Sequence, residues 1–265
     1  MIANALSIAG SDPSGGAGVQ ADLKAFAANG VYGMCAITAL TAQNTQGVRG
    51  VHLVPPEFVS DQITAVRADV RVDAVKIGMI ANAEIADAVA DALNDYRGPV
   101  VLDPVMIAKG GASLLADAAV ESLKLRLVPR ATLLTPNLPE AAALLGTAVA
   151  ETRAEMVAQG ERLLALGPAA VLMKGGHLTC EDSPDVLITP DGATWFAGPR
   201  VATKNTHGTG CTLSSSLAAG LAKGLSIIAA VEAAKAYVAG AIGKADLMSV
   251  GSGHGPVHHF HRLWD

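Results

Sequence analysis

The sequence predicts one α/β domain spanning residues 1–265, built on a doubly wound, mostly parallel sheet. Three observations indicate this fold class. At least six short apolar segments alternate with segments of helical periodicity. Glycine-rich or polar loops follow several of the apolar segments, as they do at the ligand-binding edge of parallel sheets. The chain has no internal repeat and no linker rich in serine, glycine or charge that would divide it.

The first half of the chain alternates strands and helices from its beginning. Residues 3–9 are expected to form a strand, and a helix follows at about 17–29, after the glycine loop 10–18. Proline is tolerated in the first turn of a helix and asparagine is a good N-cap, so helices are expected from Pro55 and after Asn82. The other elements expected here are a strand at 32–40, a polar loop at 41–48, helices ending near 70 and 96, and strands at 73–79 and 99–106.

The second half continues the alternation and adds a hairpin. Residues 185–188 and 193–197 read as two short strands joined at Asp191-Gly192, a strong hairpin signal, and we expect them to form an antiparallel edge. The other expected elements are a strand, turn and helix within 132–145, a helix at 152–166, a strand at 169–177, a helix opening near 208–210 and a long helix at about 226–248.

The composition excludes several classes of protein. With 51% hydrophobic residues the chain can bury a sizeable core, and a formal net charge of −5 gives no general attraction to nucleic acid or anionic membranes. Its three cysteines lie far apart without CxxC spacing, which indicates a reducing cytoplasm and neither a disulfide framework nor a zinc knuckle. No segment reads as a signal peptide or a membrane span.

The stretch TKNTHGTGCTLSSS at 203–216 is the most informative loop. Gly208 and Gly210 open a segment in which leucines recur every four residues, so a glycine turn leads into a helix. Such a turn presents backbone N–H groups at the positive end of the helix dipole, where an anion such as phosphate binds. A simple cap of a buried helix is the alternative. The chain has no GxxxxGK[ST] phosphate loop and no GxGxxG fingerprint.

Polar residues at other strand ends allow two readings each. Asp103 before Pro104 is either a turn or a catalytic or metal-binding carboxylate. Asn137 and Glu140 fit a capping box, but they could also face a phosphate-bound magnesium ion. Lys174, beside two glycines, could reach a nucleotide phosphate. The histidine-rich C-terminus GSGHGPVHHFHRLWD lacks helical ligand spacing, so we expect a docked tail rather than a metal site.

Taken together, the loop segments resemble a known enzyme family. They are GSDPSGGAGVQADLK, TALTAQNTQGV, VKIGM, VLDPVM, TPNLPEA, LMKGGH, TKNTHGTGC and GPVHHF, spread over about residues 6–264. The pattern resembles the ribokinase-like superfamily and, within it, the bacterial hydroxymethylpyrimidine/phosphomethylpyrimidine kinases of thiamine biosynthesis. The resemblance implies a three-layer α/β/α fold without a separate lid domain, ATP and Mg²⁺, a cytoplasmic location and a homodimer.

The resemblance also implies two sets of site residues. The pyrimidine would lie among Gly10, Ala17, Asp22, Gln43, Met79 and Val105. In this set the Gln43 amide offers a donor and an acceptor to the aminopyrimidine edge, and Asp22 could accept from the exocyclic amine. Met79 and Val105 would sandwich the ring. The Mg²⁺–phosphate region would comprise Asp103, Asn137 and Glu140, with Asp103 and Glu140 on the metal, Lys174 and Thr206 near the ATP phosphates, and Gly208–Cys211 as the anion hole.

Cys211 stands where most ribokinase-like enzymes have an aspartate base, although the hydroxymethylpyrimidine kinases share the cysteine. A helix N-terminus lowers a thiol pKa, so Cys211 could act as a base. It could also be a neutral group that tolerates a substrate already carrying a phosphate. The implied activity is phosphorylation of 4-amino-5-hydroxymethyl-2-methylpyrimidine, first to its monophosphate and then to its diphosphate. The alternatives are a pyridoxal kinase of the same branch and a non-catalytic nucleotide or pyrimidine sensor.

Overall fold

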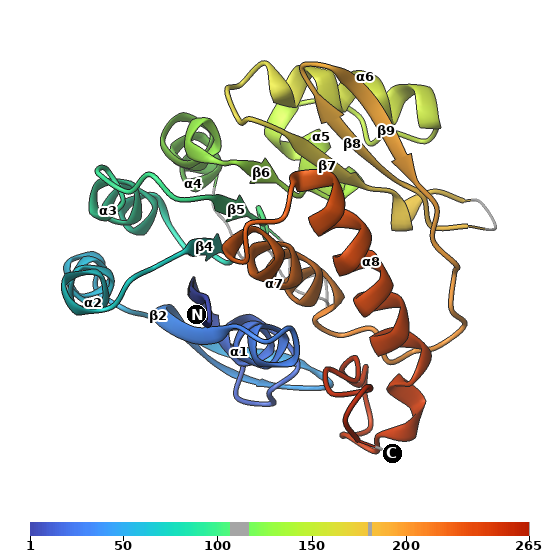
Figure 1. Ribbon diagram of the computed structural model, residues 1–265, viewed down its shortest axis with the longest axis horizontal. Coiled ribbons are helices and arrows are strands. Elements are labelled where there is room, and N and C mark those ends of the chain that lie inside the picture. Colours follow the sequence, from blue (N-terminus) through green and yellow to red (C-terminus); the bar gives the residue numbers. More distant parts are fainter. Residues whose placement is uncertain (107–116, 180–181, 265) are drawn as a thin grey trace.

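The computed structural model describes residues 1–106, 117–179 and 182–264, and strands from these ranges form one nine-stranded sheet (Figure 1). The strand order is β3-β2-β1-β4-β5-β6-β7-β8-β9. The strands are β1 (Asn4–Ser11), β2 (Tyr32–Asn44), β3 (Gly47–Leu53), β4 (Ala74–Ile77), β5 (Val100–Leu102), β6 (Leu133–Leu134), β7 (Val171–Lys174), β8 (Asp185–Thr189) and β9 (Gly192–Phe196). Strands β2, β1, β4, β5, β6 and β7 run parallel to one another, as predicted.

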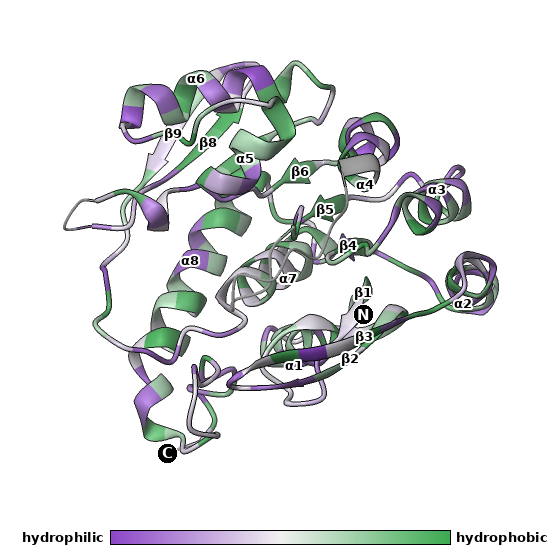
Figure 2. Ribbon diagram, turned by 180° about the vertical axis from the view of Figure 1, so that it is seen from behind, coloured by the Kyte–Doolittle hydropathy of each residue, from purple (hydrophilic) through white to green (hydrophobic). Residues whose placement is uncertain are grey.

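Helices cover both faces of the sheet and give the predicted three layers (Figure 1). One face carries α1 (Gly18–Ala28), α7 (Thr209–Ala222) and α8 (Ile227–Gly243), and the other carries α2 (Pro56–Asp69), α3 (Ala83–Ala92), α4 (Asp117–Ser122), α5 (Leu138–Leu145) and α6 (Arg153–Leu164). Successive strand residues point to opposite faces, so Val171 and Met173 join one core and Leu172 the other. In Figure 2 the strands at the centre are hydrophobic and the outer helices show hydrophilic residues.

Both edges of the sheet are antiparallel, but only one was predicted. β8 and β9 form the expected hairpin beside β7. The expectation of a loop at 41–48 was wrong, because β2 continues to Asn44 and β3 pairs with it antiparallel. Backbone pairing holds this edge hairpin, and most of β3 is exposed. Because neither face of β3 is buried, its sequence does not alternate between apolar and polar residues.

An N-cap or a proline in the first turn explains where three of the predicted helices begin. The Asn82 side chain accepts from the Ile85 N–H at 2.9 Å at the start of α3. Prolines occupy the first turns of α2 and α5.

The sequence reading missed α4 and the π-helical turn Leu123–Leu127, and it extended the last long helix beyond its end at Gly243. No helix in the described ranges has the length and apolarity to cross a membrane.

The C-terminal tail is docked, as expected. His258, His259 and His261 are buried against α7 and α8, and the Tyr237 hydroxyl donates to the His259 carbonyl at 2.7 Å. The backbone of the tail also pairs with His207, just before α7. In the part of the chain that the structure describes, no three His, Cys, Asp or Glu side chains group closely enough to hold a metal ion by themselves.

Candidate active site

Three charged side chains from neighbouring strand ends meet in front of the N-terminus of α7. Asp103 follows β5, Glu140 lies in the first turn of α5 after β6, and Lys174 ends β7. The Lys174 Nζ lies 2.8 Å from Asp103 Oδ1 and 3.6 Å from Glu140 Oε2. Parallel strands bring their carboxyl ends to one edge of the sheet, which is why residues 71 positions apart in sequence form an ion pair.

The three charges strongly affect one another's ionisation. Burial opposes ionisation of Asp103, but the ammonium groups of Lys174 and Lys76 outweigh it and hold the carboxyl pKa below its usual value. Burial and the repulsion of Asp103 raise the pKa of Glu140 to about 7, although Lys174 opposes this. The two carboxylates in turn overcome the desolvation of Lys174 and raise its pKa. The cluster therefore keeps one fixed cation beside two carboxyl groups of unequal acidity.

Glu140 serves as a helix cap and as a site residue at once. Its Oε2 accepts from the Asn137 N–H at 2.7 Å, and its own N–H donates to Asn137 Oδ1 at 2.8 Å, which completes the predicted capping box. The same oxygen faces Lys174. The two readings of this motif are thus compatible, because the cap fixes a carboxylate that belongs to the charged cluster.

The glycine turn has the shape that an anion site requires. Gly208 adopts a φ of 76°, and a Cβ there would lie 1.8 Å from the Gly16 carbonyl oxygen. A Cβ at Gly210 would lie 3.6 Å from both Asp103 Oδ2 and Lys174 Nζ, so the missing side chain leaves a cradle beside the charged cluster. The N–H groups of Gly210 and Cys211 belong to the first turn of α7, where a helix has no acceptors of its own. Thr206, placed near the phosphates by the sequence reading, precedes this turn, and its carbonyl accepts from the Thr209 hydroxyl at 2.7 Å.

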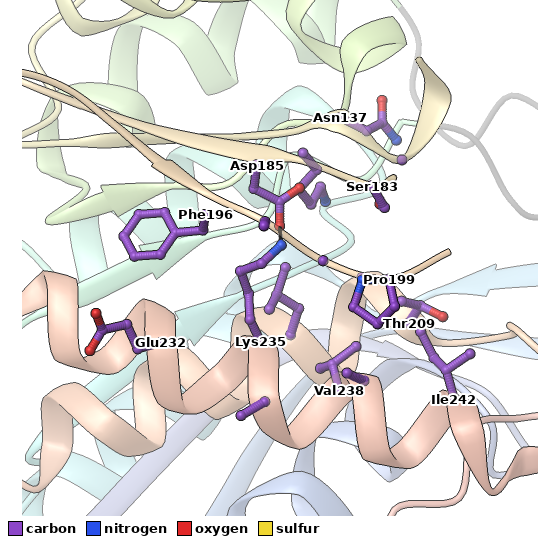
Figure 3. Close-up of a pocket in the computed structure, with 18 of the residues that line it drawn as sticks. Asn137, Ser183, Asp185, Phe196, Pro199, Thr209, Glu232, Lys235, Val238 and Ile242 are labelled. Carbon is purple, nitrogen blue, oxygen red and sulfur yellow. Dashed lines mark hydrogen bonds and ion pairs between the residues drawn. The ribbon is translucent and has the colours of Figure 1, made fainter. Parts of the chain in front are cut away.

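A cavity of about 680 Å³ opens from this cluster towards the β8–β9 hairpin and α8 (Figure 3). Lys174, Thr209 and Gly210 are among the residues that line it. Its walls are mainly apolar, and Lys235 of α8 forms an ion pair with Asp185 of β8 across one side. The wall residues include Trp195, Phe196, Ala197, Pro199, Leu213, Val238, Ala239 and Ile242. The sequence reading did not identify these residues, because apolar helix and hairpin positions look the same whether they line a cavity or a core.

The residues assigned to the pyrimidine lie at the adjoining strand ends. Gly10 is the last residue but one of β1 and lies beside Met79, whose Sδ would be 3.1 Å from a Cβ at Gly10. Ala17 caps α1, and Val105 follows β5 two residues after Asp103. Gln43 lies near the end of β2, where its Nε2 is 3.4 Å from Nε2 of His207.

Asp22 does not have the predicted role. It is fully buried, and its carboxylate lies 2.8 Å from the Nζ of Lys76, which is fully buried as well. Ser7 donates to it at 2.6 Å and Ser215 at 2.7 Å. These partners occupy both oxygens, so Asp22 is the counter-ion of a buried lysine and not an acceptor for a substrate amine. A lysine within the apolar strand AVKI was the sequence signal for this pair, because a buried ammonium group needs a partner.

The expected lowering of the Cys211 pKa is also wrong. Burial raises the pKa of the thiol to about 11, and the nearby Lys76 ammonium offsets this only in part. The Gly18 N–H donates to the sulfur. Desolvation is thus the largest influence on the Cys211 pKa, which favours a neutral thiol near pH 7 over a thiolate base.

Sequence reasoning missed Asp12 and His207, which lie beside Gln43. His207 Nε2 is 2.7 Å from Asp12 Oδ2, and both side chains are buried. Each belongs to a glycine-containing loop that the sequence reading singled out. The sequence signal that could have found them is an aspartate in the first glycine loop and a histidine in the stretch 203–216, because both loops were expected at the ligand-binding edge of the sheet.

Comparisons with known proteins agree on a family. The sequence model of the phosphomethylpyrimidine kinase family matches residues 12–258. The hydroxymethylpyrimidine/phosphomethylpyrimidine kinase of Salmonella typhimurium is 56% identical over 262 residues, which cover 98% of each chain. The ADP complex of a Bacillus subtilis pyridoxal kinase has a TM-score of 0.92 at 35% identity, covering 99% of this chain and 100% of that one. The phosphomethylpyrimidine kinase of Clostridium difficile has a TM-score of 0.80 at 44% identity, covering 90% and 98% respectively.

Proposed function

The chain belongs to the phosphomethylpyrimidine kinase family, and we propose that the cluster of Lys174, Asp103 and Glu140 is its phosphoryl-transfer site. The protein is a kinase of thiamine biosynthesis that uses ATP. It phosphorylates 4-amino-5-hydroxymethyl-2-methylpyrimidine to the monophosphate and then to the diphosphate. The observation that carries the site assignment is the position of the cluster, which adjoins Gly210 at the N-terminus of α7 and meets the cavity at Lys174.

Phosphoryl transfer needs positioning and charge stabilisation more than covalent help from the protein. The hydroxymethyl oxygen of the substrate attacks the γ-phosphorus of ATP, the bond to the ADP oxygen breaks, and the hydroxyl proton passes to an oxygen of the transferred phosphoryl group. In our proposal Lys174 and the N–H groups of Gly210 and Cys211 stabilise the negative charge on the transferred group. The cavity holds the nucleoside, its apolar walls against the base, with the phosphates towards Lys174.

The site fits a magnesium ion. Asp103 and Glu140 supply the oxygen ligands that Mg²⁺ prefers, and the cradle left by Gly210 adjoins them. Magnesium commonly binds one or two carboxylates together with substrate phosphates, so a preformed cage of three ligands is not required. When bound, the ion would neutralise charge on the phosphates. Asn137 would support this arrangement through its capping box with Glu140.

The pyrimidine would occupy the adjoining edge of the sheet. In this proposal Gln43 pairs with the aminopyrimidine edge, and Met79 and Val105 contact the faces of the ring. Gly10 and Ala17 leave room for it at the ends of β1 and of the first loop, and Thr206 lies on the phosphate side. Cys211 lies at the start of α7, where its N–H group belongs to the proposed anion hole. As a neutral thiol it would not repel a substrate that already carries a phosphate.

Phosphorus NMR of a reaction with the hydroxymethylpyrimidine, ATP and Mg²⁺ tests both the activity and the site. We expect a monophosphate signal followed by a diphosphate signal. Lys174→Met should reduce kcat by at least a hundredfold, because a charge aimed at the transferring group is worth about 3 kcal/mol or more. Full activity of this variant would refute the assignment of the site. Parallel reactions with pyridoxal address the alternative that the Bacillus subtilis neighbour raises.

We propose two further properties. The enzyme acts in the cytoplasm, as the cysteine pattern and the family resemblance suggest, and it acts as a homodimer, as the resemblance implies. Sedimentation equilibrium of the purified protein tests the homodimer, since a mass equal to that of one 26.8 kDa chain at micromolar concentration would contradict it.

A further inference from the structure

Lys235 of α8 lines the cavity and reaches across it to β8 (Figure 3). Its Nζ lies 2.5 Å from Oδ2 of Asp185, the first residue of β8. The other oxygen of that carboxylate, Oδ1, accepts from the N–H of Gly175 at 2.9 Å, and Gly175 directly follows Lys174. One carboxylate thus connects the Lys235 ammonium group to the backbone next to Lys174.

The ammonium group of Lys235 keeps hydrogens for a ligand. An ammonium group has three N–H donors, and within residues 1–106, 117–179 and 182–264 the carboxylate of Asp185 is the one acceptor that Lys235 reaches. The Lys235 side chain is only 15% exposed, and it lines the cavity. Because a largely buried cation needs acceptors for its hydrogens, a ligand of the cavity is expected to present acceptor atoms at this point.

The packing of α7 against α8 indicates which part of a nucleotide Lys235 meets. A Cβ at Gly220, near the end of α7, would be 3.0 Å from the Cβ of Ala230, near the start of α8. The two helices therefore run antiparallel, and Ile242 near the end of α8 lies beside Thr209 (Figure 3). Lys235 lies about 10 Å before Ile242 along the helix axis. A phosphate chain that begins at the anion hole thus meets Lys235 at the end that carries the nucleoside.

We propose that Lys235 binds the α-phosphate of the nucleotide. This inference rests on the proposed function, in which the cavity holds ATP with its phosphates towards Lys174. The N–H groups that Asp185 does not use donate to α-phosphate oxygens, and the ion pair with Asp185 holds the ammonium group in place. Hydrogen bonds between an ammonium group and a phosphate are charge-assisted and therefore stronger than neutral ones. The nucleoside then lies beyond Lys235, where Phe196 and Glu232 line the cavity (Figure 3).

The experiment measures the dissociation constants of ADP, AMP and adenosine by titration calorimetry, with displacement of ADP for the two weaker ligands. The proteins are the wild type, Lys235→Met, Asp185→Asn and the double variant. Asp185→Asn keeps an oxygen for the Gly175 N–H and removes the negative charge beside Lys235, so it should bind ADP and AMP at least as tightly as the wild type. Lys235→Met should weaken both at least tenfold, also in the Asp185→Asn background, and change adenosine binding less than twofold.

The opposite effects of the two single variants separate this role from a structural one. If the ion pair only joined α8 to β8, Asp185→Asn and Lys235→Met would break it alike and weaken nucleotide binding alike. The double variant also shows that the loss in Lys235→Met is not repulsion by an unpaired Asp185. Acetylation of the wild type, followed by mass spectrometry, needs no variant to fold, and AMP should protect Lys235 more than adenosine does.

Binding of AMP that is unchanged in Lys235→Met would overturn the inference, and so would an equal loss for AMP and adenosine or equal protection by the two. A wild type that binds none of the three ligands would overturn it together with the assignment of the cavity to ATP. If the expected pattern is found but the wild type phosphorylates no pyrimidine, the role of Lys235 stands and the proposed substrate fails.

Discussion

At the scale of single residues, the thiol of Cys211 combines a position at the start of α7, in the proposed anion hole, with the absence of charge. It lies in the first turn of α7, and burial raises its pKa to about 11. The second reaction of this enzyme starts from a phosphate monoester, which is already anionic. A carboxylate about 4 Å from that phosphate would cost about 4 kcal/mol at an effective dielectric constant of 20. A neutral side chain avoids this repulsion.

We therefore expect Cys211→Asp to slow the second phosphorylation at least tenfold more than the first. Single-turnover measurements that start separately from the alcohol and from the monophosphate provide the two rates. Cys211→Ser is the matched control, since a serine hydroxyl is also neutral and should change the two rates by similar factors. An equal loss of both rates in Cys211→Asp would contradict the electrostatic explanation.

The residues whose proximity could be predicted from the sequence are those that lie at strand ends, because the position at a strand end determines their surroundings. Asp103, Glu140 and Lys174 were expected at one edge of the sheet, and the structure brings them together there. Asp22 and Cys211 were misjudged because their behaviour depends on burial and on partners from distant elements, Lys76 among them. His207 was missed for the same reason, since its partner Asp12 lies 195 residues away.

At the scale of elements, the two glycines of the turn have different purposes. Gly208 is required by the backbone, because of its positive φ and its contact with the Gly16 carbonyl. Gly210 has no such restriction, and a methyl group there would make ordinary contacts with Asp103 and Lys174. Gly208 therefore allows the first glycine loop to approach the start of α7, and Gly210 keeps the space beside Asp103 and Lys174 open.

Alanine substitutions should separate these purposes. Gly208→Ala is expected to lower the free energy of unfolding by about 3 kcal/mol or more, since strain and a clash with backbone add together. Gly210→Ala should leave that free energy within about 1 kcal/mol of the wild type, because alanine favours a helix. It should nevertheless reduce kcat/KM for ATP at least tenfold. Urea denaturation and steady-state kinetics on both variants measure these effects, and an unstable but fully active Gly210→Ala would contradict the assignment.

The elements themselves were predictable where burial imposes a pattern. The parallel strands are buried on both faces and read as apolar runs, and the α5 capping box appears directly in the sequence. The β2–β3 hairpin was not predictable in this way, because an exposed edge strand has no buried side to repeat every second residue. The end of α8 was overextended because the helix passes into a separate 3₁₀ turn at Ala245–Leu247, which contains no Gly or Pro to mark the boundary.

At the scale of the whole molecule, the docked tail links the last residues of the chain to the first loop. Its backbone pairs with His207, whose ring in turn holds Asp12. Its side chains pack on α7 and α8, where His259 Nε2 lies 3.0 Å from the Thr212 hydroxyl in the first turns of α7. The docked tail therefore contacts both His207, at the candidate site, and the first turns of α7.

Acid should weaken this docking through His259. Burial, with smaller contributions from the cations of Lys24 and His258, lowers the pKa of its imidazole to about 3. The unfolded chain, with an ordinary pKa of about 6.5, takes up a proton first as the pH falls, so stability is lost below about pH 6.5. Between pH 7 and pH 5 the free energy of unfolding should fall by about 2 kcal/mol more in the wild type than in His259→Gln. The glutamine keeps a polar nitrogen near Thr212 but does not titrate. Urea denaturation at several pH values measures the difference, and an identical pH dependence in the two proteins would show that His259 is not buried in its neutral form.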